Sequence, residues 1–265
     1  MAVRNDAAAR ISLGDFLAKI RGELVPLTDR FVYFSASPLN DEDLRDYLED
    51  PIAALPRGVK DLIPPVIVLL VPYLERANGK ERGNGAKDHA GDGDWIVFER
   101  PPEGKALRSA QIAGRSGEAV IALPVDDLEV ADAHYEFYHQ IAWLTGRLAS
   151  PDLLSAFSAL VHEELANRMH GEVDEESWQY KQALLRRQSK VRDSKAFREY
   201  ARASFVDTLT LYLHGICCDI DVETGPRQLP SRYLRKRLKM LHGVFPPPKG
   251  YAVFPEDLDA NPVAS

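Results

Sequence analysis

Residues 206–218 (VDTLTLYLHGICC) decide the fold of the C-terminal half, because they are apolar on nearly every side. A helix of this kind has to be buried on most sides, which predicts a helix packed inside a bundle. The stretch also contains one carboxylate, Asp207, and one imidazole, His214. Seven residues are about two helical turns, so both side chains project from one face roughly 20° apart. Since a buried charge is costly unless it is paired or ligated, each group needs a partner, either structural or functional.

The sequence on both sides of this stretch has the apolar period of helices. The predicted helices cover residues 131–148, 152–169, 175–188, 195–216 and 231–241. We predict that Gly146, Gly171 and Gly243 end helices, because glycine is common just past the last helical turn. The pattern predicts a helical half over residues 128–245.

The N-terminal half, residues 1–127, has the pattern of a mixed sheet. Residues 66–71 (VIVLLV) are strongly β-branched and predict a central strand. Three further strands are predicted, at residues 31–35, 95–99 and 119–123. An amphipathic pattern predicts a helix over residues 11–24, and Asn40 is predicted to cap a short helix.

Two segments have the composition of irregular structure. Residues 76–94 are rich in glycine and charge, which predicts a flexible loop. Residues 246–265 are proline-rich and acidic, which predicts an extended tail. The fold class expected is therefore α+β, with an N-terminal mixed β-sheet and flanking helices followed by a C-terminal bundle of about five helices.

The composition of the 265 residues is that of a globular protein, with 45% hydrophobic and 28% charged residues. The longest apolar run is far shorter than the roughly 20 residues that span a bilayer. The N-terminus lacks the apolar core of a secretory signal, which predicts a cytoplasmic location without membrane partners. The two cysteines, Cys217 and Cys218, are adjacent and cannot form an ordinary disulfide framework.

The net charge of −7 is unevenly distributed along the chain. Residues 1–180 contain 18 basic and 31 acidic side chains, whereas residues 181–240 contain 14 basic and 6 acidic ones. The basic region 186–239 could face an anionic partner, nucleic acid included, although the chain contains no recognised nucleic-acid motif. The alternative is that the two charge regions complement each other within the fold or across an oligomer.

The last predicted helix is amphipathic and strongly basic. Leu234, Leu238 and Leu241 form its apolar stripe. Five cations surround this stripe in the prediction, namely Arg232, Arg235, Lys236, Arg237 and Lys239.

Glu136 and His139 form a carboxylate–imidazole pair at the i, i+3 spacing that metal sites in helical bundles use. Dinuclear sites of that kind need a second such pair, and the sequence contains no second Glu-x-x-His. The alternative is an exposed or hydrogen-bonded pair without a metal.

The segment that begins at His139 (HQIAWLTG) resembles the metal-binding helix of zincin metallopeptidases, which have His-Glu-x-x-His, often with a later glycine. Here Gln140 stands at the position of the general base and Trp143 at that of the second histidine. The resemblance covers eight residues, and these two departures remove a base and a ligand, so ordinary zincin catalysis is not expected.

His162 adjoins Glu163, but Ala166 at the fifth position again breaks the zincin pattern. The candidate catalytic residues are Asp207, His214 and His162. The candidate ligands of a divalent metal such as zinc are Glu136, His139, His162 and His214. A carboxylate that orients an imidazole is a common support for a catalytic or metal-bound histidine.

Three functional classes follow from these residues, and the sequence leaves open whether the chain is an enzyme. The first is a metal-assisted hydrolase with its site between helices of the C-terminal half. The second is a non-catalytic interaction or scaffold protein whose buried His and Asp groups fix the helix register. The third is a binder of an anionic partner through residues 186–239.

Overall fold

The structure is a computed structural model that describes residues 10–77, 94–114, 117–186, 194–218, 227–254 and 256. Most of the predicted loop 76–94 and half of the predicted tail 246–265 lie outside these residues. The chain divides into two compact units. The sheet unit contains residues 1–49 and 64–140, and the helical unit contains residues 50–63 and 141–265. The sequence boundary at residue 127 precedes the last helix of the sheet unit, whereas the division falls inside that helix.

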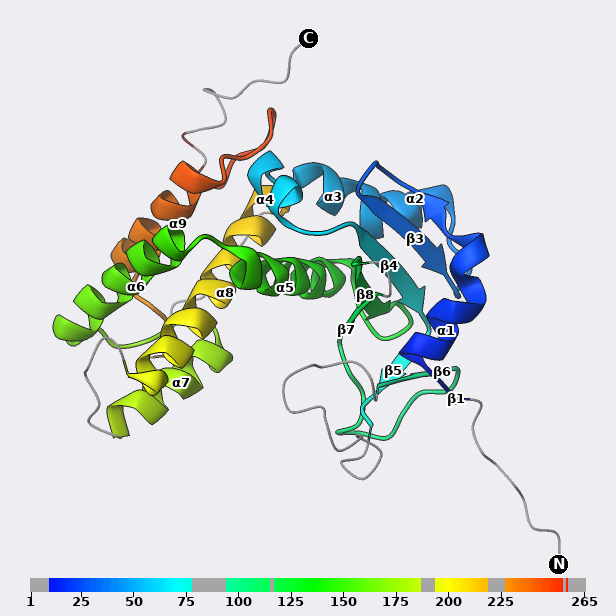
Figure 1. The fold of residues 1–265 in the computed structure, drawn as a ribbon, viewed down its shortest axis with the longest axis horizontal. Helices are drawn as coiled ribbons and strands as arrows, with labels where there is room; N and C mark the ends of the chain where they lie inside the picture. The colour runs from blue at the N-terminus through cyan, green and yellow to red at the C-terminus, as the bar shows by residue number, and fades with distance from the viewer. Residues whose placement is uncertain are drawn as a thin grey trace, which may run out of the picture. The chain divides into compact units, whose positions relative to one another are not determined.

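The main sheet of the sheet unit has five strands in the order β2-β3-β4-β8-β7 (Figure 1). The strands are β2 (Val25–Pro26), β3 (Phe31–Ser35), β4 (Val66–Val71), β8 (Ala119–Pro124) and β7 (Ala110–Ala113). The three central strands are parallel, and the two edge strands are antiparallel to their neighbours. Every residue of β4 and β8 is buried, which explains why these strands are continuous apolar runs. The mixed sheet predicted from the sequence is confirmed.

A second, antiparallel sheet contains β1 (Arg10–Ser12), β6 (Trp95–Val97) and β5 (Tyr73–Glu75). The strand predicted at residues 95–99 therefore exists as β6 but belongs to this smaller sheet. The single helix predicted at 11–24 is partly wrong, because β1 precedes α1 (Leu13–Ile20). The Ser12 side chain accepts a hydrogen bond from the Asp15 amide and so caps α1 at its first turn.

Helix α1 covers one face of the main sheet. Its side chains Leu13, Phe16, Leu17 and Ile20 pack in one hydrophobic cluster with Ile67, Leu69 and Val71 of β4. After Ile20 the chain forms a 3-10 turn, η1 (Arg21–Glu23), so α1 does not extend over the sheet beyond this residue. The predicted cap at Asn40 is confirmed as a capping box at the start of α2 (Asp41–Leu44), which continues into η2 (Arg45–Glu49).

The helical unit contains α3 (Asp50–Ala54) and α4 (Arg57–Leu62), which the sequence analysis did not predict. Its longer helices are the last part of α5 (Val130–Leu148), α6 (Pro151–Ala166), α7 (Glu175–Arg186), α8 (Lys195–Cys217) and α9 (Ser231–Val244). The predicted C-terminal helical region is confirmed. No helix in the described part of the chain is long and apolar enough to cross a membrane.

Helix α8 is the interior helix of this unit, with α6, α7 and α9 against it (Figure 1). Fourteen of its 23 residues are buried, as the apolar stretch 206–218 predicts for this helix. The residues at its core include Phe205, Leu209 and Tyr212, none of which is exposed to solvent.

The three glycines predicted as helix stops have different roles. Gly171 does not end α6, because that helix ends at Ala166 with Asn167 as its cap. Gly171 has a φ of +80, and a Cβ there would lie 2.1 Å from the Gln228 carbonyl oxygen, so only glycine fits. The other two predictions are wrong, because α5 runs through Gly146 and α9 through Gly243. Gly146 faces α8, and a Cβ there would lie at an ordinary contact distance of 3.4 Å from the side chains of Phe205 and Val206.

Candidate functional site

Asp207 lies in α8 and holds the first turn of α7. Its Oδ2 accepts a hydrogen bond of 2.9 Å from the backbone amide of Ser177, one of the amides that has no partner within its own helix. A carboxylate oxygen of Glu176 lies within 4.8 Å of the Asp207 carboxylate. Burial raises the pKa of Asp207 to about 7, although hydrogen bonds from Ser177 oppose the rise. The negative charges of Asp174 and Glu176 raise this pKa further.

His162 and His214 are not brought together. The His162 ring packs against the ring of Phe197 near the start of α8, with the centroids 5.8 Å apart. His214 lies in the last turn of the same helix. Phe197 and His214 are 17 residues apart in α8, which corresponds to roughly 25 Å along the helix axis. The two imidazoles therefore cannot ligate one ion, and a catalytic or metal role for either stays a prediction.

Glu136 on α5 is used within the sheet unit. Its Oε2 accepts a hydrogen bond of 2.6 Å from the Ser109 hydroxyl, and its Oε1 lies 3.3 Å from Nε of Arg108. Gln140, which replaces the zincin general base, donates to the same Ser109 hydroxyl at 2.9 Å. These contacts attach α5 to the segment before β7. His139 is half-buried on the same helix, and metal ligation by the Glu136–His139 pair stays a prediction.

A buried cluster of charges, which the sequence analysis missed, lies in the interior of the helical unit. Its members are Arg237 of α9, Glu164 of α6, Lys181 of α7, and Glu172 in the segment between α6 and α7. Each of the four side chains is at most 1% exposed. The guanidinium of Arg237 donates to both oxygens of Glu164 at 3.1 Å through Nε and to Glu172 at 2.9 Å through Nη1. We call these four residues the charge cluster.

Neutral hydrogen-bonding groups complete the charge cluster. Lys181 donates to the Glu172 carboxylate at 3.2 Å and to the Gly171 carbonyl at 2.7 Å. Ser204 of α8 accepts from Arg237 at 2.7 Å, and the Tyr200 hydroxyl donates to Glu172. Burial alone would raise the pKa of Glu172, but the charge and hydrogen bonds of Arg237, with the charge of Lys181, lower it below its ordinary value. With two cations and two carboxylates, the charge cluster is neutral.

Arg237 was expected on the surface of a basic helix, and that expectation is wrong. The buried residues of α9 are Leu234, Arg237 and Leu241. They are spaced three and four residues apart, so the arginine lies on the apolar stripe of the helix. This spacing is the signal in the sequence that could have identified Arg237 as a buried cation.

Several other cations of the basic region have carboxylate partners inside the fold. Lys236 pairs with Glu163 at 2.9 Å, Arg227 with Glu175 at 3.8 Å, and Arg235 with Glu256. This pairing agrees with the alternative that the charge regions complement each other within the fold. Residues 187–193 and 219–226 of the basic region lie outside the described residues.

A pocket of about 350 Å³ lies entirely within the helical unit. Its ten lining residues are Gly146, Arg147, Leu154, Ser155, Phe157, Ser158, Arg198, Ala201, Arg202 and Phe205. We call it the arginine pocket. Three of these residues are arginines and two are serines, whereas none is Asp or Glu. The volume is within the range of small-molecule sites.

The arginines of the arginine pocket are placed by two helices. Arg198 and Arg202 are one turn apart on α8, a spacing at which like charges repel by about 0.2–0.5 kcal/mol. Arg147 comes from the end of α5, where its guanidinium lies 4.6 Å from the ring centroid of Trp143. Within the described residues, Arg202 forms no ion pair.

Two aromatic rings belong to the lining of the arginine pocket. Phe157 of α6 and Phe205 of α8 pack edge to face with their centroids 5.2 Å apart. The guanidinium carbon of Arg237 lies 5.9 Å from the centroid of the Phe157 ring. Phe157 therefore contacts the charge cluster and also lines the pocket.

Comparison of the chain with protein-family models, with curated proteins and with solved structures gives no significant match. Its function therefore has to be argued from the residues of the site.

We predict that Arg237→Met destabilises the protein by about 3–5 kcal/mol, because it leaves two buried carboxylates without their main cation. The matched control is Arg235→Met on the same helix, where the side chain is 48% exposed and the cost should stay below about 1 kcal/mol. Urea unfolding of both variants measures the difference. Equal costs for the two variants would contradict the stabilising role of the charge cluster.

We predict that Asp207 makes the protein less stable as the pH rises from about 4 to about 7. The folded-state pKa is above the ordinary value of 3.8, so the folded protein binds more protons than the unfolded chain across this interval. In Asp207→Asn an amide oxygen still accepts from Ser177 without an ionisation cost. The variant should therefore gain stability relative to the wild type between pH 5 and pH 8, by on the order of 3 kcal/mol.

The comparison requires urea unfolding of both proteins at the two pH values. Asp61→Asn, the same substitution at a carboxylate on α4 that is 64% exposed, serves as the control and should leave the pH dependence nearly unchanged. If the difference in the free energy of unfolding between wild type and Asp207→Asn is the same at pH 5 and pH 8, the prediction for Asp207 is wrong.

Proposed function

We propose that the protein binds a small anionic molecule in the arginine pocket of the helical unit. The observation that carries the proposal is the composition of the lining, which contains three arginines and two serine hydroxyls without a carboxylate. Guanidinium groups bind phosphate and carboxylate oxygens through paired N–H donors, and serine hydroxyls can add further donors.

The positions of the arginines support this proposal. Internal carboxylates pair with Arg237 and with several surface cations of the basic region, whereas no Asp or Glu lines the arginine pocket. The repulsion between Arg198 and Arg202 disfavours the empty pocket, and a bound anion would offset it. The proposal narrows the third class expected from the sequence, a binder of an anionic partner through residues 186–239, to one site that also includes Arg147.

The aromatic part of the lining favours a ligand with an apolar body next to its anionic group. Phe157 and Phe205 offer ring surface at the pocket, and aromatic contacts add to the attraction of an aromatic ligand. Phenyl phosphate is therefore the probe of choice, with inorganic phosphate as the probe for the anionic group alone.

We expect phenyl phosphate to bind saturably and more tightly than inorganic phosphate in a calorimetric titration. Arg202→Gln should lower the affinity about tenfold or more, since one charged hydrogen bond contributes about 1.5–3 kcal/mol. Arg57→Gln is the matched control, because it removes the same charge from a side chain on α4 that is 94% exposed. If both variants bind equally, the attraction comes from net charge and the arginine pocket is not the site.

A second candidate function is a metal-assisted hydrolase, favoured by Asp207. A buried carboxyl group with a pKa of about 7, close to the Glu176 carboxylate, is suited to acid–base chemistry or to holding a divalent metal such as zinc. Metal analysis of the purified, tag-free protein tests this candidate. The metal-assisted hydrolase predicts near-stoichiometric metal in the wild type and loss of that metal in folded Asp207→Asn. Metal-free wild type would leave the Asp207 carboxyl as a support of α7 alone.

A further inference from the structure

A second pocket, of about 320 Å³, lies in the sheet unit. It is lined by Arg21, Leu24, Arg30, Val32, Pro65, Val66, Ile67 and Glu118. It belongs to the part of the main sheet that lies just past the end of α1, where the chain leaves the helix through η1. We call it the sheet pocket.

The register of the sheet brings three of these residues to one edge. Arg30, Pro65 and Glu118 directly precede the parallel strands β3, β4 and β8, whose first residues are paired in the ladder. Val32 and Ile67 are register partners one step further along, and they share a face because side chains alternate along strands. The pocket thus combines an aliphatic wall with charged groups at a fixed edge.

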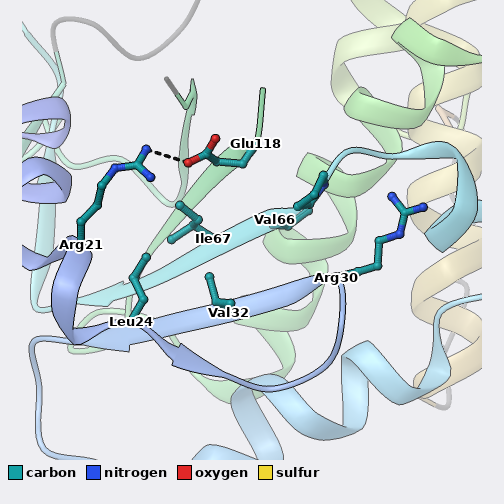
Figure 2. A pocket seen from close by; sticks show the side chains of 8 residues that line it. Arg21, Leu24, Arg30, Val32, Val66, Ile67 and Glu118 are labelled. Atoms are coloured by element: carbon teal, nitrogen blue, oxygen red, sulfur yellow. Dashed lines mark ion pairs between the residues drawn. The ribbon is translucent and has the colours of Figure 1, made fainter. Parts of the chain in front are cut away.

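Figure 2 shows the Arg21 side chain reaching across to Glu118, with Ile67 and Val66 between this ion pair and Arg30, and with Leu24 and Val32 below them in this view. The Arg21 and Glu118 side chains are 2.6 Å apart and are 37% and 10% exposed. A cation and an anion therefore lie side by side at one end of an aliphatic surface, and both are within reach of solvent.

The backbone of Gly114 fixes the position of Glu118. The Gly114 amide donates to the Glu118 carbonyl at 2.7 Å. A Cβ on Gly114 would lie 2.5 Å from Cγ and 2.7 Å from Cδ of Glu118, so any larger residue would displace the carboxylate. The glycine therefore keeps the carboxylate beside Arg21.

We propose that the sheet pocket binds a free α-amino acid with an aliphatic side chain. The α-carboxylate would accept hydrogen bonds from Arg21, and the α-ammonium group would donate to Glu118. The four charges would then alternate in sign around the ion pair. The aliphatic side chain would contact Leu24 and Val32, which are half-buried and pack against the hydrophobic cluster that contains the buried Ile67.

The chemistry of the site distinguishes this ligand from simpler ones. A carboxylate without an amine would be attracted by Arg21 but repelled by the negative charge of Glu118. An alkylamine would be attracted by Glu118 but repelled by the positive charge of Arg21. Only a zwitterion satisfies both groups without leaving one charge unbalanced. The proposal is independent of the anion site in the helical unit, because it depends on different residues in the other unit.

The test is a calorimetric titration of the full chain with L-leucine, 4-methylpentanoate and 3-methylbutylamine, three compounds that share the same branched alkyl group. We expect saturable binding of L-leucine with a Kd of about 1 mM or tighter, and at least tenfold weaker binding of the other two. Glu118→Gln should weaken L-leucine binding at least tenfold, and the control Arg57→Gln should leave it unchanged.

Gly114→Ala retains both charged residues but displaces Glu118, so it should also weaken L-leucine binding at least tenfold. Circular dichroism and urea unfolding of the same variants verify that each remains folded. Failure of wild type to bind L-leucine, or equal binding of L-leucine and 4-methylpentanoate, would overturn the proposal. Unchanged L-leucine binding by folded Glu118→Gln would overturn it as well.

Discussion

The neutrality of the buried charge cluster is the constraint on which the helical unit depends. Arg237, Glu164, Glu172 and Lys181 come from α9, α6, the segment before α7, and α7 itself, and all four are shielded from water. Removing any of these charges from water is costly unless its partners are already in place. The cluster therefore stabilises the unit only when all of these segments are docked around α8, which adds Tyr200 and Ser204. Gly171 is part of the same constraint, because its positive φ and close approach to Gln228 bring Glu172 to the interior.

The arginine pocket is built on this cluster. Phe157 lies between the two, since its ring is close to Arg237 and also lines the pocket. Arginines lie on both sides of the Phe157 ring, and their surroundings differ. In the charge cluster, the carboxylates of Glu164 and Glu172 neutralise Arg237. In the pocket, Arg147, Arg198 and Arg202 converge without any Asp or Glu in the lining. A cationic pocket that packs against a neutral, buried cluster through Phe157 is a suitable arrangement for binding an anion.

The sequence predicts the positions of the long elements well and the partners of the polar groups poorly. The apolar run at 66–71 and the helical periods after residue 128 depend on local pattern, and β4 and the helices α5 to α9 lie where that pattern predicts. The edge strand β7 was missed because its four residues, AQIA, carry only one β-branched side chain. Arg237 was misplaced because its partners, Glu172 and Glu164, are 65 and 73 residues away in the chain. Similarly, the partner of Asp207 is the backbone amide of Ser177, which no side-chain pattern could indicate.

The central claim is that one arginine of this unit is enclosed in a neutral cluster while three others line a pocket that contains no Asp or Glu and, as we propose, binds an anion. Nitrogen-15 NMR of the arginine Nε–H groups during a titration with phenyl phosphate tests both halves of the claim in one experiment. The account predicts a slowly exchanging Arg237 resonance that stays in place, together with saturable shifts of the Arg147, Arg198 and Arg202 resonances. Rapid solvent exchange of Arg237, or equal small shifts of all surface arginines, would contradict the account.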